Sequence, residues 1–463
     1  MADLSLVEVR RALAAGELSA VEVTEAALER GERFAGYNLF ITALPEQARE
    51  AAAAADRAWE TDGPCGPLHG VPITVKDNID VAGLPTTAGS PVFADRVATT
   101  DAPVVTQLRQ AGAIVLGKTN LHELALGGTT MNPFHGTVPN AWQPEHIAGG
   151  SSGGSAAGVA LGVGYASVGT DAAGSIRIPA SCCGLVGFKP THGLVPLRGL
   201  IPTGCEHTDH VGPLARSVAD ARAMLQVMAA PDPDDPHSCG RPASSAPPRD
   251  DLAGLRVGVP EAWFWDDLDP QVEAAALAVL DLMISNGATP SPVPMDILHL
   301  APLLLLPLFV EAYVFHQPTL DACPELYSPD LRHQLMAGQY VLAQDYIRAL
   351  RARRLVIEAL RRAIDAVDVL AMPTLPIVPP RIADVQTPDV LELIRNTSVI
   401  NQSGHPAVSL PMGLAAEGVP MGFQLVGQVH DDHGLLAVAE AVERLIGFDM
   451  SLLATRTGTA TRN

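Results

Sequence analysis

The 463-residue sequence predicts an α/β fold, and two observations support this prediction. Segments with apolar residues at helical spacing alternate with short runs of β-branched residues bounded by glycine, a pattern typical of helices packed on a sheet. Hydrophobic residues make up 47% of the chain and charged residues 17%, a composition typical of a globular protein with a substantial core.

Helices are expected at the start of the chain. Residues 4–60 place apolar side chains at helical spacing and end in the alanine-rich segment 45-PEQAREAAAAADRAWE-60. From there the pattern changes, and 70-GVPITVKDNIDVAG-83 holds a β-branched run punctuated by glycine. The next segment, 103-PVVTQLRQAGAIVLGKTN-120, predicts a helix followed by a buried strand over 113–117.

The second half of the chain alternates in the same way. Strand-like segments lie at 184–196, 254–259 and 367–373, and a helical block over 335–367 precedes the last of them. Between them, 231-PDPDDPHSCGRPASSAPPRDD-251 is rich in Pro, Asp and Ser, which predicts a loop. Because strands of similar character flank it, we interpret 230–252 as a surface loop inside one large fold.

Charge and hydropathy argue against nucleic-acid and membrane partners. The formal net charge is −21, which repels phosphate backbones and anionic lipid headgroups. The most apolar run, 300-LAPLLLLPLFV-310, contains two prolines and is too short to cross about 30 Å of hydrocarbon. The first 23 residues lack a basic segment followed by an apolar one, so no signal peptide is predicted. We therefore expect a cytoplasmic protein.

Cysteine and histidine usage predicts neither a disulfide framework nor a metal centre. The 6 cysteines are scattered without CxxC spacing, and adjacent Cys182 and Cys183 are typical of small core residues in a reduced protein. No group of His, Asp and Glu has the spacing of metal ligands. We expect no metal and no cofactor.

The stretch 147-IAGGSSGGSAAG-158 allows three interpretations from its residues. A flexible linker is disfavoured because small, apolar residues follow it where a linker has polar ones. A nucleophile elbow, G-x-S-x-G over 149–153, would make Ser151 the nucleophile, but it needs a strand directly before it, and 139–148 holds two prolines. A phosphate cradle lacks the G-x-x-x-x-G-K-[ST] pattern, and the acidic balance gives it no support.

From residue 149 to residue 180 the sequence resembles the amidase signature family, with 149-GGSSGGS-155 followed by small residues and 171-DAAGSIRIPA-180. Segments 72–83, 117–140, 186–202 and 399–427 are also similar to that family, and the resemblance is thin between about 230 and 350. It implies a single amidase signature domain over 1–463, built on a large mixed or mostly parallel twisted β-sheet surrounded by α-helices. The implied catalytic core spans 66–220, and a variable helical region over 295–350 would form the substrate pocket.

The resemblance assigns a Ser-Ser-Lys catalytic unit to Ser175, Ser151 and Lys76. Ser175 would be the nucleophile that forms an acyl-enzyme, and Ser151, after a cis peptide bond, would relay the proton to Lys76. Lysine is a base only when neutral, which requires its pKa to fall by roughly three units from about 10.4, at a cost of about 4 kcal/mol. Ile73 and Val75 beside Lys76 predict a buried strand that would supply this desolvation.

The same resemblance assigns supporting roles around the two serines. The amides of Ala172, Ala173, Gly174 and Ser175 would form the oxyanion hole. Ala173 stands where the family usually has glycine, a difference that would tighten the wall of this site. We expect Asp171 and Arg177 to form an ion pair that holds the loop, and Ser152 to hydrogen-bond Lys76 and orient it.

A Ser-His-Asp triad is the alternative catalytic unit. His122, His135, His192, His207 and His210 all lie near the motif region, so such a triad stays open from the sequence alone. This triad is less favoured once Lys76 is assigned as the base, because a lone histidine is more often a structural or exposed side chain.

Two segments are expected to line the substrate pocket. The resemblance places Gly128, Thr129, Thr130 and Met131 on the acyl side. In the variable region, Leu304, Phe309, Tyr313 and Phe315 would either face the cleft or belong to the core. If they face the cleft, the substrate is apolar or aromatic.

We therefore predict a serine hydrolase that cleaves C–N bonds of small apolar or aryl amides, with carbamates (urethanes) and esters within reach of the same tetrahedral chemistry. One alternative is the A subunit of a glutamyl-tRNA amidotransferase, which releases ammonia from glutamine and needs partner subunits. An alternative of another class is a catalytically silent binding or scaffold protein. The resemblance also implies a homodimer as one assembly state.

Overall fold

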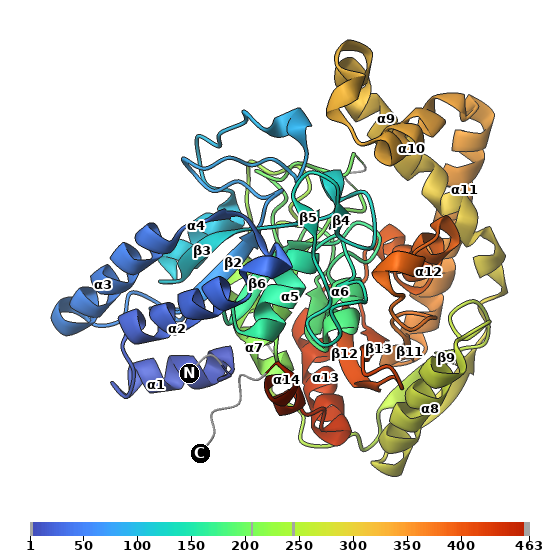
Figure 1. Cartoon of the computed structure of the whole chain (residues 1–463). Coiled ribbons are helices and arrows are strands. Elements are labelled where there is room, and N and C mark those ends of the chain that lie inside the picture. Colours follow the sequence, from blue (N-terminus) through green and yellow to red (C-terminus); the bar gives the residue numbers. More distant parts are fainter. Residues whose placement is uncertain (1–2, 205–206, 243–245, 458–463) are drawn as a thin grey trace.

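The computed structural model describes residues 3–204, 207–242 and 246–457, with only the backbone at 387–390. It confirms the α/β class, because one eleven-stranded sheet crosses the molecule between layers of helices (Figure 1). The strand order is β1-β3-β2-β6-β8-β7-β12-β13-β11-β9-β10. These strands are β1 Phe40–Ala43, β2 Pro72–Lys76, β3 Ile114–Thr119, β6 Ala166–Thr170, β7 Val186–Lys189, β8 Val211–Ala215, β9 Arg256–Pro260, β10 Thr289–Val293, β11 Val369–Pro373, β12 Ala407–Leu414 and β13 Pro420–Val426.

The sheet is mixed, one of the two forms expected. Strand β2 pairs in parallel with β3 and β6 near one end, and β9 pairs in parallel with β11 and β10 at the other. The strands between β6 and β11 pair antiparallel. All five residues of β2 are buried, so its last residue, Lys76, lies in the interior. A separate two-stranded ribbon joins β4 (Met131–Asn132) and β5 (Gly136–Thr137).

Fourteen α-helices occur in the described residues, and local sequence signals start several of them. Ser5 with Glu8, and Ser19 with Glu22, form capping boxes at the first two helices. The helices are α1 Leu6–Ala14, α2 Ala20–Arg33, α3 Pro45–Asp62, α4 Pro103–Gln110, α5 Gly153–Leu161, α6 Arg177–Cys183, α7 Val218–Met228, α8 Pro270–Ser285, α9 Leu305–Ala322, α10 Pro329–Ala337, α11 Ala343–Asp365, α12 Thr387–Ser403, α13 Asp432–Ile446 and α14 Ser451–Arg456.

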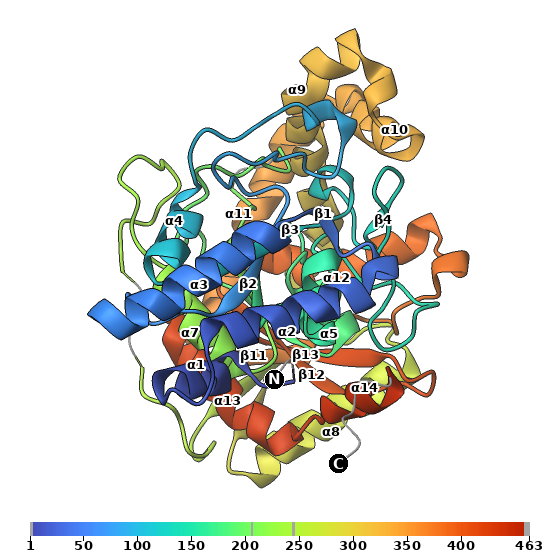
Figure 2. The ribbon, with the colours of Figure 1, turned by 60° about the vertical axis from the view of Figure 1, so that its left-hand side comes forward.

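Several hydrophobic clusters join the helices to the faces of the sheet. One cluster joins α7, α8 and α13 to the strands, with α4 packed against α7, and another contains α5 and α6. A further cluster joins α11 and α12 to β11, β12 and β13. Helices α2 and α3 lie side by side next to β2 and β3 (Figure 2). The glycine-serine stretch leads into α5, which packs against β2, β6 and β8 and against α6.

The glycine-serine stretch is packed in the interior, which contradicts the linker interpretation. All nine residues of α5 are buried, and the helix ends at Gly162 in the left-handed conformation, with φ of 84°. A Cβ at Gly154 would lie 2.5 Å from the carbonyl oxygen of Asn120 and 2.7 Å from that of Leu39. The glycines are therefore required for close approach of neighbouring backbones.

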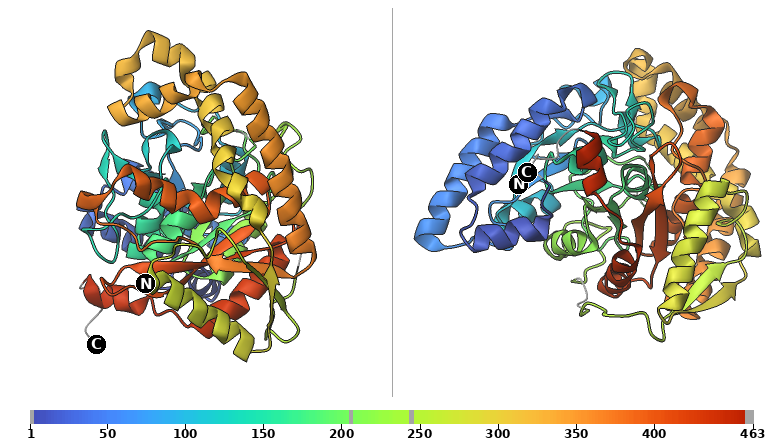
Figure 3. Two further views of the ribbon diagram at one scale, coloured as in Figure 1. Left: turned by 90° about the vertical axis from the view of Figure 1, so that its right-hand side faces the viewer. Right: turned by 60° about the horizontal axis from the view of Figure 1, so that its bottom comes forward.

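The helices α9, α10 and α11 form a unit at the opposite end of the molecule from α1–α3 (Figure 3). A short 3-10 helix, Asp296–Leu304, leads into α9. Together they make a 27-residue run whose most apolar 18-residue window has a mean hydropathy of 1.9, so by length and composition the run could cross a membrane. Core helices of soluble proteins are often equally long and apolar, so this run alone is only weak evidence for a membrane-spanning segment. The described parts of 230–252 contain no helix or strand.

Candidate active site

Lys76, at the end of β2, is fully buried between two hydroxyl groups. Its Nζ lies 2.7 Å from Ser151 Oγ and 2.7 Å from Thr170 Oγ1. Burial lowers the pKa of Lys76 to about 7, although the charges of Asp171 and Asp209 act in the opposite direction. A lysine with this pKa is substantially neutral at physiological pH and has a lone pair that accepts a proton.

Ser151 follows a cis peptide bond from Gly150 and is fully buried. Thr130 holds this segment, because its Oγ1 lies 2.9 Å from the carbonyl oxygen of Gly149 and accepts a hydrogen bond from the amide of Gly153 at 3.0 Å. A Cβ at Gly150 would lie 2.8 Å from the amide nitrogens of Thr129 and Thr130. The backbone around Ser151 therefore needs glycine to pack this tightly.

Ser175 lies in the turn between β6 and α6 and is 7% exposed, whereas Lys76 and Ser151 are 0% exposed. Its carbonyl oxygen accepts a hydrogen bond from the amide of Ser152 at 3.3 Å, which joins the two serine-bearing segments. Within the described residues, no hydrogen bond links the Ser175 hydroxyl to Ser151. Of the three residues, Ser175 is thus the one that reaches the surface.

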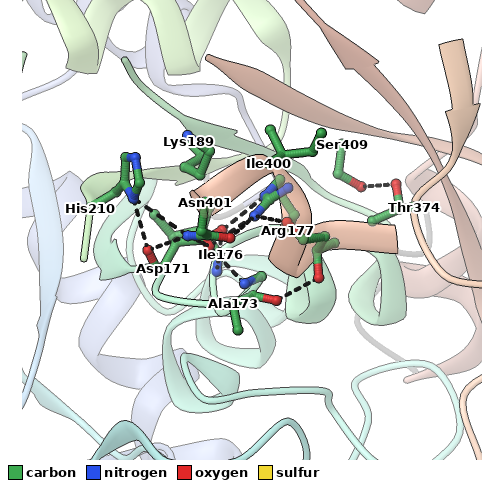
Figure 4. Close-up of polar contacts among 12 residues, drawn as sticks. Asp171, Ala173, Ile176, Arg177, Lys189, His210, Thr374, Ile400, Asn401 and Ser409 are labelled. Carbon is green, nitrogen blue, oxygen red and sulfur yellow. Dashed lines mark hydrogen bonds and ion pairs between the residues drawn. The ribbon is translucent and has the colours of Figure 1, made fainter. Parts of the chain in front are cut away.

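The turn that carries Ser175 is held by a fully buried ion pair (Figure 4). Both nitrogens Nε and Nη2 of Arg177 lie 3.0 Å from the carboxylate of Asp171. Burial alone would raise the pKa of Asp171, but the charge and hydrogen bonds of Arg177, with help from Lys189 and Asn401, hold it well below its usual value. Arg177 also donates to Gln424 at 2.7 Å, which ties the turn to β13. The expected ion pair is therefore present.

The Asp171 carboxylate also removes one amide from the expected oxyanion hole. It accepts hydrogen bonds from the amides of Gly174 at 2.7 Å and Ile176 at 3.2 Å. Because the Gly174 amide is engaged, including it among the free donors was wrong. The amides of Ala172, Ala173 and Ser175 make no such bond to any described residue.

Ser152 does not orient Lys76, contrary to expectation. Its hydroxyl donates instead to the carbonyl oxygen of Thr170 at 3.2 Å. The contact with Lys76 comes from the Thr170 side chain, a residue that the sequence-based prediction missed, and Asn78 also donates to Thr170 Oγ1 at 3.2 Å. The only available signal was a hydroxyl residue placed directly before the Asp171 motif.

The four residues predicted on the acyl side of the pocket differ in their surroundings. Thr130 is fully buried with its hydroxyl on the Gly149–Gly153 backbone, so it supports Ser151 and does not line a pocket. Thr129 Oγ1 lies 3.2 Å from Nδ1 of His122. Met131 is half-buried against an apolar cluster that includes Ile178, three residues after Ser175, and Gly128 lies next to Leu393 of the same cluster.

The four residues predicted in 304–315 do not share one surface. Leu304 is 1% exposed and packs beside α11, so of the two expected locations it occupies the core and not the cleft. Tyr313 packs partly buried against the cluster that contains Leu124 and Leu126, and Phe309 lies against Gly338. Phe315 is 44% exposed and lies at a separate groove of about 380 Å³.

Two histidines near the motif are poorly suited to act as a catalytic base. Burial, with the charge of Lys76, lowers the pKa of His122 to about 4. Burial likewise lowers the pKa of His210, and its Nδ1 donates to the carbonyl oxygen of Thr208 at 2.7 Å. Among the described residues, neither ring hydrogen-bonds to Ser151 or Ser175.

Comparison with known proteins identifies the family to which this chain belongs. The family model named Amidase matches residues 22–436. The chain is 37% identical to the A subunit of the glutamyl-tRNA(Gln) amidotransferase of Nitratidesulfovibrio vulgaris (strain DP4), over 96% of this chain and 97% of that one. It is 32% identical to the corresponding protein of Lachnospira eligens, over 96% of this chain and 98% of that one.

Solved structures of related enzymes share the fold. A chain of a vestigial protein complex, described as revealing the evolutionary origins of an s-triazine catabolic enzyme, superposes with a TM-score of 0.90 at 32% identity, over 95% of this chain and 98% of that one. A bacterial aryl acylamidase superposes at 0.88 and 25% identity, over 99% of both chains. The A subunit of the Thermotoga maritima amidotransferase superposes at 0.80 and 28% identity, over 96% of this chain and 95% of that one. The chain therefore belongs to the amidase signature family of serine hydrolases, enzymes that act on C–N amide bonds.

Proposed function

We propose that this protein hydrolyses amides through an acyl-enzyme on Ser175, with Ser151 as proton relay and Lys76 as base. One observation carries the proposal: a buried lysine whose pKa is about 7 lies 2.7 Å from the hydroxyl of Ser151. A neutral amine next to a hydroxyl is the arrangement that removes a proton from a serine nucleophile.

The reaction follows from these positions. Lys76 takes the proton of Ser151 as Ser151 takes that of Ser175, and Ser175 Oγ attacks the carbonyl carbon. The amides of Ala172, Ala173 and Ser175 donate to the oxyanion that forms. The protons then return through Ser151 to the leaving nitrogen, the C–N bond breaks, and water hydrolyses the ester by the same route. The Ser151–Ser175 contact has to tighten on substrate binding, as catalytic hydrogen bonds often do.

We propose small apolar or aryl amides as substrates. The cluster of Ile147, Ile178, Cys182, Leu375 and Leu393 lies next to the Ser175 turn, and the half-buried Met131 and Ile394 pack against it. An apolar wall at this place favours an apolar acyl group. Similarity to the aryl acylamidase supports the same class. Carbamates and esters pass through the same kind of tetrahedral intermediate, so they belong to the proposed range.

A second candidate function is release of ammonia from glutamine as the A subunit of an amidotransferase. The curated relatives with that name, at 32% and 37% identity along nearly the whole chain, favour it. In this case the chain would work with partner subunits, and one similar solved chain is likewise described as part of a vestigial protein complex. A stand-alone enzyme would instead act as a monomer or homodimer in the cytoplasm.

The deciding experiment measures turnover by the purified chain alone on anilides, aryl carbamates and glutamine. Release of aniline by wild type, and its loss in Ser175→Ala and Ser151→Ala, supports the stand-alone hydrolase. Ser285→Ala, an exposed serine at the end of α8, is the matched control and should keep full activity. Turnover of glutamine alone would favour the amidotransferase function. Full activity in Ser175→Ala would overturn both.

A further inference from the structure

An apolar groove lies along α3, and none of its lining residues belongs to the proposed active site. A groove of about 540 Å³ is bounded on one side by α3, which contributes Ala51, Ala54, Ala55 and Ala58 at helical spacing. Leu84 and residues of β3 form the opposite wall. Because the side chains of α3 are so small, the helix leaves an apolar space where larger residues would fill it (Figure 2 shows α3 in front of β3).

Cys65 and His69 both line this groove and form a hydrogen-bonded pair. The Sγ of Cys65 lies 3.1 Å from Nδ1 of His69, and the Cys65 thiol is exposed. The Cys65 amide also points at Nδ1, at 3.2 Å, and an amide only donates, so Nδ1 carries no proton. His69 Nε2 lies 3.1 Å from the carbonyl oxygen of Ala55, which only accepts, so Nε2 carries the proton.

These two partners fix the tautomer in which the imidazole is able to take the proton of the Cys65 thiol. The arrangement has the three parts of an activated nucleophile: a thiol, an adjacent base, and a third group that orients the base. Gly112 is necessary for it, because a Cβ there would lie 2.7 Å from Cys65 Sγ and 2.6 Å from the Cα of His69. The backbone conformation of Gly112, with φ of +91°, also favours glycine.

We propose that Cys65 and His69 form a covalent capture site for small apolar electrophiles with an activated carbon–carbon double bond. In the reaction, the thiol proton moves to Nδ1 of His69 and Sγ bonds to the β-carbon of the electrophile. The π electrons move to the α-carbon, which takes the proton back from Nδ1. Atoms and electrons balance, and no further reactant is consumed.

The groove selects the apolar class of electrophile. Its walls are mostly alanine, leucine and valine side chains, and its one arginine, Arg109, is already paired with Asp101 at 2.8 Å. An anionic reagent therefore finds no free guanidinium or ammonium group among the groove residues.

Burial raises the pKa of the Cys182 and Cys183 thiols, which keeps these two cysteines protonated and unreactive.

The test compares rates of alkylation by N-phenylmaleimide and N-(2-hydroxyethyl)maleimide on the full-length protein, with each rate divided by that of the same reagent with glutathione. Peptide mass mapping assigns the modified cysteine. Cys239 is the internal reference, because it is half-buried and, in the described part of the chain, its Sγ has one hydrogen-bond partner, the carbonyl oxygen of Arg241 at 3.8 Å. We expect Cys65 to react at least about tenfold faster than Cys239, the contribution of an adjacent base.

Two substitutions separate the base from the groove. His69→Gln should bring the Cys65 rate close to that of Cys239 for both reagents. Ala54→Gln should leave the base effect and remove the preference for the phenyl reagent, whereas Ala53→Gln, on the same helix but outside the groove lining, should change neither. Equal rates at Cys65 and Cys239 in the wild-type protein would overturn the proposal without any variant. A rate that His69→Gln leaves unchanged, in a protein that keeps its amide turnover, would overturn the role of the base.

Discussion

The hydroxyl of Thr170 lies 2.7 Å from the amine of Lys76, and the hydroxyl of Ser151 lies at the same distance from that amine. Thr170 is the last residue of β6 and Lys76 the last of β2, and these strands pair in parallel. The neighbouring strand ends therefore bring the two side chains together. This contact fixes the direction of the lysine lone pair relative to Ser151.

Thr170→Val should lower kcat by about 10- to 100-fold, because valine keeps the shape of threonine but cannot accept the Lys76 hydrogen bond. Thr170→Ser, which retains a hydroxyl, should recover most of the rate. Steady-state kinetics on the best anilide measures both. A Thr170→Val variant as active as wild type would show that Ser151 alone orients the lysine.

Activity should rise with pH through about 7. The base is the neutral form of Lys76, and its pKa is about 7, so kcat/KM should fall about tenfold for each pH unit below that value. Initial rates between pH 5 and 9 test this. A flat profile from pH 5 to 8 would contradict a lysine base and would fit a group with a pKa near 4, such as His122.

Lys76→Met should stabilise the protein more at pH 7 than at pH 9. The folded-state pKa of about 7 lies below the ordinary 10.5, so burying the amine costs stability fully at low pH and less as pH rises toward 10.5. The predicted cost is about 4 kcal/mol at pH 7 and about 2 kcal/mol at pH 9. Urea denaturation at both pH values measures the difference, and Ser175→Ala, which removes no such group, should show none.

Asp171→Asn should lower the free energy of unfolding by about 3–5 kcal/mol, because it leaves the Arg177 guanidinium buried without its carboxylate partner. The same substitution loosens the turn that presents Ser175, so activity should fall as well. Glu358→Gln, at an exposed ion pair with Arg361, is the control and should leave stability nearly unchanged. Equal denaturation midpoints for the two variants would contradict the structural role of Asp171.

Gly174→Ala should abolish most activity. The φ of Gly174 is +128°, and an added Cβ would collide with Thr397 Oγ1, which donates to the carbonyl oxygen of Ala173 at 2.6 Å. Ala173→Gly should be tolerated, because it removes a side chain and needs no space. Anilide turnover and thermal unfolding of the two variants give the comparison, and similar losses in both would show that this position is not sterically restricted.

The sequence indicated the residues that carry the proposed chemistry more accurately than the residues that surround them. Lys76, Ser151 and Ser175 belong to local motifs whose residue types and spacing are specific, and the structure brings Lys76 and Ser151 into contact. Ser152 was paired with Lys76 because it is adjacent to Ser151, but its hydroxyl points to the carbonyl oxygen of Thr170. For Leu304 the sequence left cleft and core open, because hydropathy does not separate a core residue from a pocket wall, and the structure places it in the core.

By itself, the sequence determined the α/β class, because hydrophobic periodicity is a local property. Its motifs indicated the residues of the site and the need for glycine around Ser151 through their resemblance to the amidase signature family. Only the tertiary structure decided that Thr170 holds Lys76, that Asp171 occupies the Gly174 amide, and that Cys65 and His69 open into a groove beside α3. The Lys76–Thr170 contact joins residues 94 positions apart. Such contacts depend on which strands pair and in which register, and that order results from packing the whole sheet rather than from any single motif.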